Sequence, residues 1–369
     1  MKNAAQKKTD EEYMRLCLEL ARKGAGHVSP NPLVGCVIVK NGKIIGLGWH
    51  KKYGEAHAEV NAIGSAVESV KGATAYVNLE PCSHKGKTPP CVDLLIEKKI
   101  ARVVVGTRDI NVLVNGRGIR KLKSAGIDVT EGVLEKESRE LNKFFFHWMD
   151  TKLPYVTLKL AQTIDGKISD AMGKQTWISS KESQKYVHQL RSEYDAVLVG
   201  SGTYIIDKPM LTVRHVKGRN PVRVTLDSKL RGEYGRKFLS ADAKTIIFTS
   251  AKAIQTKKGE LLMKKGVTLI AAPRTHGGLE LAFVLRTLGS IGIASVLVEG
   301  GNAIATSFIT HNLADELLLF IAPKLFGKGV PAFGGSSSAS AIPASFPNLT
   351  DVSAEQIGED ILIKGVFRK

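Results

Sequence analysis

The chain contains 369 residues, of which 43% are hydrophobic, 24% are charged and 6% are aromatic. It is too long for one ordinary domain and apolar enough to bury real cores, so we expect two domains. The net charge is +18, from 53 basic and 35 acidic residues. A basic surface favours polyanions or phosphorylated small molecules. Because the basic residues are scattered without a tail or an aromatic stripe, the charge does not by itself indicate nucleic acid.

Targeting signals and cysteines bear on the compartment. No apolar run reaches the length that spans a bilayer, and residues 1–10 lack the apolar stretch of a signal peptide. We therefore expect a soluble, cytoplasmic protein. Cys17 and Cys36 fall within helical and strand patterns and are expected to be core thiols, whereas Cys82 and Cys91 are expected to bind metal and not to form a disulfide.

The first 150 residues alternate helices and strands. Thr9-Asp10-Glu11-Glu12 is a capping box, which predicts that a helix begins there and ends before Gly24. Asn41-Gly42 predicts a tight turn between strands 35–39 and 44–49. Further strands are expected at 75–79, 102–105 and 127–129, with helices starting near residues 57 and 90, one at 119–124 and one at 134–149. We expect the aromatic end of that last helix to pack against the next domain.

A second alternating pattern follows a boundary at residues 150–154. Strands are expected at 155–161, 196–199, 223–226, 245–248, 267–270 and 295–299, with helices at 180–192 and from residue 303. Residues 334–344 read as a loop. The sequence therefore predicts two α/β domains, 1–150 and 154–369.

His57-Ala58-Glu59, Pro81-Cys82 and Cys91 together carry the groups of a catalytic zinc site. One imidazole and two thiolates are three protein ligands, which leaves the fourth position for water. Zinc lowers the pKa of that water, and a carboxylate that is not a ligand can carry protons. Nucleobase deaminases show H-x-E followed by P-C and a second Cys in this order. The alternative is a surface His and Glu beside two buried thiols that behave as small hydrophobes.

Glu299-Gly300-Gly301, between a predicted strand and helix, has the form of a phosphate cradle. Glycines let the backbone approach a ligand, and a helix N-terminus presents free N–H groups. Glycines at such turns are also often only structural, so this motif alone leaves both interpretations open. The G-x-G-x-x-G fingerprint of an ordinary Rossmann domain is not present at this turn.

Several segments resemble the bifunctional riboflavin-biosynthesis deaminase/reductase family. In the first half they are the segment 31–39 and the stretch from Glu80 to Cys91, where eight residues separate the two cysteines. In the second half they are 158–167, 175–180, 211–214, 298–301 and 321–324. The similarity extends from roughly residue 10 to residue 369.

The resemblance implies a cytidine-deaminase-like α/β/α domain followed by a dihydrofolate-reductase-like α/β domain. The first would hydrolytically deaminate 2,5-diamino-6-(5-phosphoribosylamino)pyrimidin-4-one with one zinc ion per chain. The second would reduce the ribosyl group with NADPH, giving 5-amino-6-(5-phosphoribitylamino)uracil. The expected partners are this phosphorylated pyrimidine and further copies of the chain in a homo-oligomer, without nucleic acid or membrane.

The same resemblance implies roles for individual residues. In the first half, His57, Cys82 and Cys91 would hold zinc, Glu59 would shuttle protons, and Asn31, His50 and His84 would lie near the substrate. The positions that match the NADPH site are Ala161, Trp177, Thr203, Asp207, Ser228, Gly301, Asn302, Ala303, Ile304, Ala305, Thr306 and Ser307. The positions that match the reductase substrate site are Gln175, Arg191, Leu211, Arg214 and Glu299.

The chain departs from the family pattern at three places. Asp109-Ile110-Asn111-Val112 lacks the two prolines of the usual Asp-Pro-Asn-Pro, Lys208 replaces an Asp beside the expected cofactor site, and Gln175 replaces a smaller polar residue. Without the family, Trp177 and Leu211 could be core residues, Arg191 and Arg214 solvated charges, and Asp207 a turn residue. Two other functions stay open at this point: a nucleic-acid base deaminase with a non-catalytic C-terminal binding domain, and an enzyme in which one half is structural.

Overall fold

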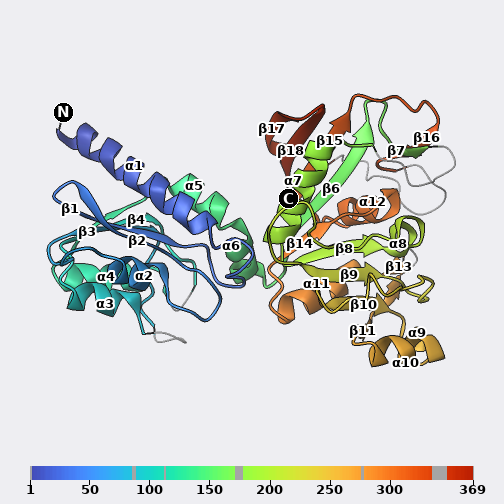
Figure 1. Cartoon of the computed structure of the whole chain (residues 1–369), viewed down its shortest axis with the longest axis horizontal. Helices are drawn as coiled ribbons and strands as arrows, with labels where there is room; N and C mark the ends of the chain where they lie inside the picture. Colours follow the sequence, from blue (N-terminus) through green and yellow to red (C-terminus); the bar gives the residue numbers. More distant parts are fainter. Residues whose placement is uncertain are drawn as a thin grey trace. The chain divides into compact units, whose positions relative to one another are not determined.

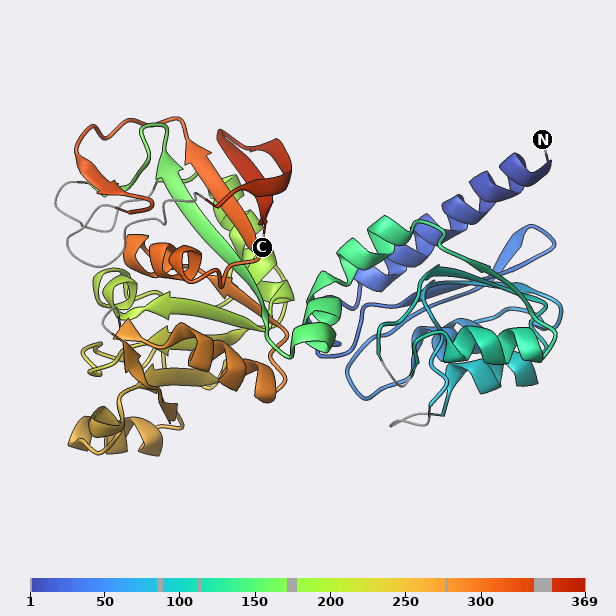
Figure 2. The ribbon, with the colours of Figure 1, turned by 180° about the vertical axis from the view of Figure 1, so that it is seen from behind.

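The computed structural model describes residues 2–84, 89–111, 114–170, 178–275, 278–334 and 347–368. The chain divides into two compact units, Met1–Lys152 and Leu153–Lys369. Figures 1 and 2 show each unit from two sides. Among the described residues, no helix combines the length and the apolar character needed to cross a bilayer.

The first unit is built on a five-stranded sheet in the order β2-β1-β3-β4-β5. The strands are β1 (Gly35–Lys40), β2 (Lys43–Trp49), β3 (Thr74–Leu79), β4 (Arg102–Thr107) and β5 (Asp128–Glu131). β1 runs antiparallel to β2 and β3, whereas β3, β4 and β5 are parallel. The helices are α1 (Lys2–Arg22), α2 (Ala58–Gly64), α3 (Cys91–Glu97), α4 (Arg117–Ser124), α5 (Glu135–Leu141) and α6 (Lys143–Thr151).

Helices cover both faces of this sheet. Alternate residues of β1 point to opposite faces, and apolar residues on each face pack against helices. Cys36 and Ile38 pack with residues of α2, α3 and α4 in one core. Val37 and Val39 pack with Met14 and other residues of α1 in a second core. Figure 1 shows α1 on the opposite side of this sheet from α3 and α4. The result is an α/β/α sandwich in which Cys17 and Cys36 are both fully buried, as expected of core thiols.

Two helix predictions in this unit were wrong. α1 begins at Lys2 and not at Thr9, because the Ala, Gln and Lys residues before Thr9 are good helix formers. The expected helix at 134–149 is broken at the buried Asn142, whose side chain exchanges hydrogen bonds of 2.7 and 2.9 Å with the backbone of Leu33. The aromatic end packs within its own unit, since Phe145 and Phe146 lie on Leu79.

The second unit contains a nine-stranded sheet in the order β11-β10-β9-β8-β14-β6-β15-β18-β17. Its strands are β6 (Tyr155–Thr163), β8 (Ala196–Gly200), β9 (Val222–Leu226), β10 (Thr245–Thr249), β11 (Thr268–Ala271), β14 (Ser295–Val298), β15 (Glu316–Ala322), β17 (Leu349–Ile357) and β18 (Asp360–Phe367). All neighbouring pairs from β11 to β15 are parallel, and β18 and β17 continue the sheet antiparallel. Two small ribbons pair β7 (Lys167–Asp170) with β16 (Gly329–Pro331) and β12 (Arg274–Thr275) with β13 (Gly278–Leu279).

The helices of this unit are α7 (Lys181–Glu193), α8 (Ser201–Asp207), α9 (Ala251–Ile254), α10 (Lys257–Lys264), α11 (Leu281–Ser290) and α12 (Asn302–Thr310). α11 and α12 pack on the main core of one face, and α7 packs on Phe320 and Leu362 of the other. Sequence analysis did not predict β15, β17 or β18. β17 is exposed along most of its length, so it lacks the apolar alternation that identifies a strand.

Candidate active sites

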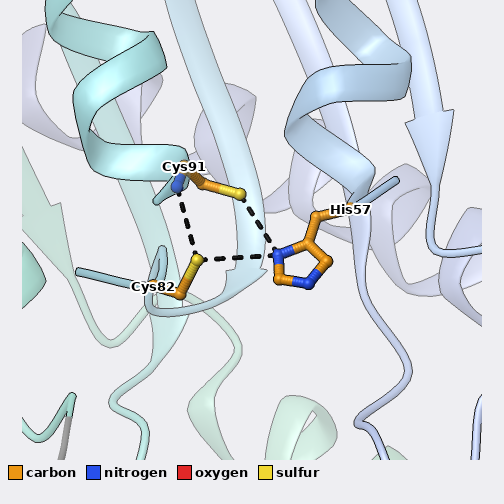
Figure 3. Close-up of side chains that lie close together, drawn as sticks. All are labelled: His57, Cys82 and Cys91. Atoms are coloured by element: carbon orange, nitrogen blue, oxygen red, sulfur yellow. Dashed lines mark hydrogen bonds between the residues drawn. The ribbon is translucent and has the colours of Figure 1, made fainter. Parts of the chain in front are cut away.

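Three side chains in the first unit form a compact group with the composition of a zinc site. Cys91 Sγ lies 3.3 Å and Cys82 Sγ 3.6 Å from His57 Nδ1, and the backbone N–H of Cys91 donates to Cys82 Sγ at 3.3 Å (Figure 3). The three ligand atoms all lie within 4.8 Å of one another. The bonds from Cys91 and His57 lower the pKa of the Cys82 thiol, which favours the thiolate that a metal requires. This donor set fits zinc.

The local structure explains why these three residues meet. His57 is the N-cap of α2, and Cys91 is the first residue of α3 after Pro90. Cys82 follows the end of β3, the central strand of the sheet. Two helix starts and one strand end therefore converge at one edge of the sheet, where backbone N–H groups also favour negatively charged sulfur.

Glu59 lies beside this group in the first turn of α2 and is 3% exposed. Burial raises the pKa of its carboxyl group, and the charge of Cys82 adds to the rise. A buried carboxyl group beside a metal site, itself not a ligand, can both accept and return a proton.

A cavity of about 230 Å³ opens beside the three ligands and is lined by Asn31, His50, His57, Glu59, Cys82 and His84 among others. His50 Nδ1 lies 3.1 Å from the carbonyl oxygen of Ala56, and its Nε2 lies 3.2 Å from Asn31 Nδ2. Because a carbonyl only accepts, Nδ1 carries the proton and Nε2 accepts from the Asn31 amide. Burial also lowers the pKa of His50, so the ring is neutral and leaves the Asn31 oxygen as the acceptor that a substrate can use.

A larger cavity, of about 980 Å³, lies at the carboxyl ends of the parallel strands in the second unit. Ligands of open α/β sheets bind at this edge. Its lining includes the expected cofactor residues Ala161, Thr203, Asp207, Ser228, Gly301, Asn302, Ala303, Ile304 and Ser307, and the expected substrate residues Arg191, Leu211, Arg214 and Glu299. Ala305 and Thr306 do not line it, because they are buried on the inner side of α12. Gln175 and Trp177 lie outside the described residues.

The glycine turn before α12 is tightly built. A Cβ added to Gly300 would lie 1.7 Å from Ile304 Cγ2, whereas one added to Gly301 would meet nothing closer than Thr203 Oγ1 at 3.5 Å. The Gly301 N–H donates to that hydroxyl at 3.0 Å, and the side-chain amide of Asn302 donates to the Pro331 and Gly334 carbonyls. Gly300 is therefore required for packing, while the open surface at Gly301 can receive a ligand.

The two expected substrate residues Arg191 and Glu299 bind each other. Arg191 Nε and Nη2 donate to the two carboxylate oxygens of Glu299 at 2.6 and 2.8 Å, and Nη1 donates to the Thr212 carbonyl at 3.1 Å. Three of the five guanidinium N–H donors are thus engaged within the protein. Arg214, by contrast, is exposed, and within the described parts of the chain its side chain makes only a 3.5 Å contact with the Thr212 hydroxyl.

Two protein-family models match this chain, one in each of its two units. Residues 154–363 match the model of the RibD C-terminal domain, and residues 7–107 match the cytidine and deoxycytidylate deaminase zinc-binding region. Riboflavin biosynthesis protein RibD of Aquifex aeolicus is 46% identical over 96% of this chain and 97% of its own length. The Escherichia coli protein of the same name is 40% identical over 86% and 89%.

Solved structures of similar proteins match this chain over almost its whole length. The diaminohydroxyphosphoribosylaminopyrimidine deaminase/5-amino-6-(5-phosphoribosylamino)uracil reductase of Thermotoga maritima is 40% identical, with a TM-score of 0.86 over 98% of this chain and 100% of that one. Acinetobacter baumannii RibD is 34% identical, with the same score and coverage. The chain belongs to the RibD family.

RibD family membership confirms the expected fold class and the expected bifunctional enzyme, a deaminase joined to a reductase of riboflavin biosynthesis. It also confirms the expected cofactors, zinc for the deaminase and NADPH for the reductase. These findings contradict the alternative of a nucleic-acid base deaminase with a non-catalytic C-terminal domain.

Sequence reasoning missed several residues of both RibD cavities. Asp109 and Asn111 line the deaminase cavity, and burial raises the pKa of Asp109 to about 6. They follow β4, whose parallel neighbour β3 leads to Cys82, and the carboxyl ends of parallel neighbours meet at one edge. That rule could have placed them in the site from the sequence alone.

In the reductase cavity the missed residues include Lys159, His188 and His215. His188 lies one helical turn before Arg191, so their spacing already placed both on one face of α7. Its Nδ1 accepts the backbone N–H of Arg214 at 3.0 Å, and burial, with the charges of Arg191 and Arg214, lowers its pKa to about 4. His188 is therefore neutral at pH 7 and adds no charge to the site. Lys159 was signalled by a single charge within the apolar run of β6.

Proposed function

We propose that this chain deaminates 2,5-diamino-6-(5-phosphoribosylamino)pyrimidin-4-one in its first unit and reduces the ribosyl group of the product in its second. The observation that carries the proposal is the presence of two separate, differently equipped cavities in a chain similar to RibD proteins along its whole length. The smaller has a zinc donor set with a buried carboxyl group, and the larger suits a dinucleotide and a phosphorylated substrate.

In the deaminase, His57, Cys82 and Cys91 hold the zinc, which when bound supplies an activated water as nucleophile. With zinc bound, Glu59 would accept a proton from the attacking water and deliver it to the ring nitrogen beside the reacting carbon. It would then move the remaining proton of the added hydroxyl to the amino group, which leaves as ammonia while the carbonyl forms. Its burial and raised pKa suit both directions of transfer. The neutral His50 holds the Asn31 amide so that its oxygen faces the substrate, and His84 completes the cavity wall.

In the reductase, NADPH when bound supplies the hydride. Ala161, Thr203, Asp207, Ser228 and the first turns of α12 would hold the cofactor, with Trp177 as a further contact that we infer from the sequence alone. Arg214 receives the substrate phosphate because its guanidinium is exposed on the cavity wall. Arg191 holds Glu299 at the wall of this cavity, where both side chains can contact the substrate.

We further propose that the protein works in the cytoplasm as a homo-oligomer. Phosphorylated substrates and a reduced dinucleotide are cytoplasmic metabolites, and the free thiols of Cys82 and Cys91 need a reducing compartment to bind zinc.

The test is a product analysis. Purified protein is incubated with the diaminopyrimidinone phosphate, with and without NADPH, and the products are identified by mass. The proposal expects the deaminated phosphoribosylamino compound without NADPH and the ribityl compound with it. An unchanged substrate in both reactions, with zinc bound, would refute the substrate assignment.

A further inference from the structure

A buried carboxylate outside the assigned set binds the segment that follows β4. Glu80 is 3% exposed. Its Oε2 accepts the backbone N–H groups of Gly116 at 2.9 Å and Asp109 at 3.3 Å, and its Oε1 accepts the N–H of Ile119 at 3.2 Å. These donors come from both ends of one segment, so a single side chain clips together the end of β4 and the first turn of α4.

Described residues on both sides of positions 112 and 113 contribute to one wall of the deaminase cavity. Asp109, Asn111 and Val114 all line that cavity, and Asp109 Oδ1 accepts the N–H of Asn111 at 2.8 Å. None of the expected zinc ligands and no part of Glu59 is among these three residues. These residues therefore contribute to the cavity wall without supplying a zinc ligand.

Glu80 is also fixed with respect to the zinc group. Its own N–H donates to the Thr107 carbonyl at 2.9 Å, and Cys82 follows two residues later. Across the contact, a Cβ on Gly118 would lie 2.3 Å from the Pro81 carbonyl oxygen, so the segment packs directly on the strand end that carries Cys82.

We propose that Glu80 is a positioning residue of the deaminase. It holds the Asp109–Asn111 wall at a set distance from the zinc group, so that the pyrimidine ring binds in the position needed for reaction. Only a carboxylate suits this position, because all three partners are donors and it can accept at both oxygens. The inference rests on the proposed function for the identity of the substrate, but the clip itself can be tested without any substrate.

The experiment compares Glu80→Gln and Glu80→Ala in the full-length, zinc-loaded protein. Gln keeps one oxygen for Asp109 and Gly116 but turns its NH2 group toward the N–H of Ile119, while Ala removes every acceptor. We expect the KM for the diaminopyrimidinone phosphate to rise roughly tenfold in Gln and further in Ala, the usual scale for a lost charge-assisted bond. The kcat should stay within about twofold and zinc at parent level. Amide hydrogen exchange across residues 107–119 should accelerate in both variants.

Asp10→Asn is the matched control. Asp10 is equally buried in the same unit, where it accepts from Arg102 and Tyr76, but it does not line the cavity. An equal KM rise in Asp10→Asn at similar loss of Tm would overturn the proposal, because it would show general destabilisation. Zinc loss in Glu80→Gln, unchanged KM, or unchanged exchange would each overturn it as well. If the parent protein does not deaminate the compound, the substrate assignment fails, and the exchange measurement still decides whether the clip exists.

Discussion

Arg191 and Glu299 form a bidentate ion pair at the reductase cavity, with Nε–Oε1 and Nη2–Oε2 distances of 2.6 and 2.8 Å. Their side chains are only 10% and 11% exposed. The charge of Arg191 lowers the pKa of Glu299 against the opposing effect of burial. A carboxylate is thus kept ionised in a place that would otherwise favour its protonation.

This pair predicts a specific pattern of stability. Removing one partner leaves a buried charge without compensation, so Arg191→Met should lower the free energy of unfolding by about 3–5 kcal/mol. Arg191→Met with Glu299→Gln should lose less than the sum of the two single losses. Thermal unfolding of the full chain measures this, and strictly additive losses would show that the pair contributes no coupling.

Arg214 should behave differently from Arg191, because its guanidinium is exposed and engages no carboxylate in the described structure. Arg214→Ala should lower kcat/KM for the phosphorylated reductase substrate by roughly one to two powers of ten. Tm and deamination should hardly change. Lys at this position keeps the charge but not the fork, so Arg214→Lys should recover part of the activity. A dephosphorylated analogue gives the control: an equal loss on it would mean that Arg214 does not serve the phosphate.

Replacing one of the proposed zinc ligands should remove the metal. Cys82→Ser removes one of two sulfur donors within 4.8 Å of the other ligand atoms, so the protein should lose its zinc and its deaminase activity. Reduction of the ribosyl group should persist when the deaminated intermediate is supplied, because the reductase cavity lies in the other unit. Metal analysis by mass spectrometry checks this, and stoichiometric zinc in an active Cys82→Ser protein would contradict the assignment.

Replacing Glu59 should stop proton transfer without removing the metal. Glu59→Gln keeps the size of the side chain but cannot exchange protons, so deamination should fall at least about a hundredfold. Zinc content should match the parent because Glu59 is not a ligand. Near-normal turnover in the zinc-loaded variant would assign the shuttle to another group.

Replacing Gly301 with a branched residue should weaken cofactor binding selectively. Its φ is −80°, and an added Cβ meets no atom closer than 3.5 Å, so Gly301→Val should fold. The branched side chain should nevertheless block the approach of the dinucleotide and weaken NADPH binding, measured by cofactor fluorescence, while zinc stays at parent level. Gly235→Val is the control, because that glycine has open space around it and does not line the cavity. Equal NADPH affinity in Gly301→Val and the parent would place the cofactor elsewhere.

The sequence alone was sufficient to single out His57, Cys82 and Cys91 as a candidate metal group and to predict most of the regular structure. His57, Cys82 and Cys91 could be recognised because ligand type and local spacing suffice for a metal site, and helix starts and strand ends follow from local backbone preferences. The central strands were predictable because buried parallel strands are short apolar runs. The edge strand β17 was not, since its exposed face carries no such pattern.

Only the tertiary structure decided which charged groups pair. Arg191 and Glu299 are 108 residues apart, and Glu80 and Gly116 are 36 apart, so no local spacing relates them. The order of parallel strands brings their elements to the same sheet edge, and burial then requires each charge to find a partner there. For this reason Arg191, interpreted from the sequence as a substrate contact, is bound to Glu299, and Glu80, which the sequence presents only as the residue before Pro81-Cys82, holds the wall of the deaminase cavity.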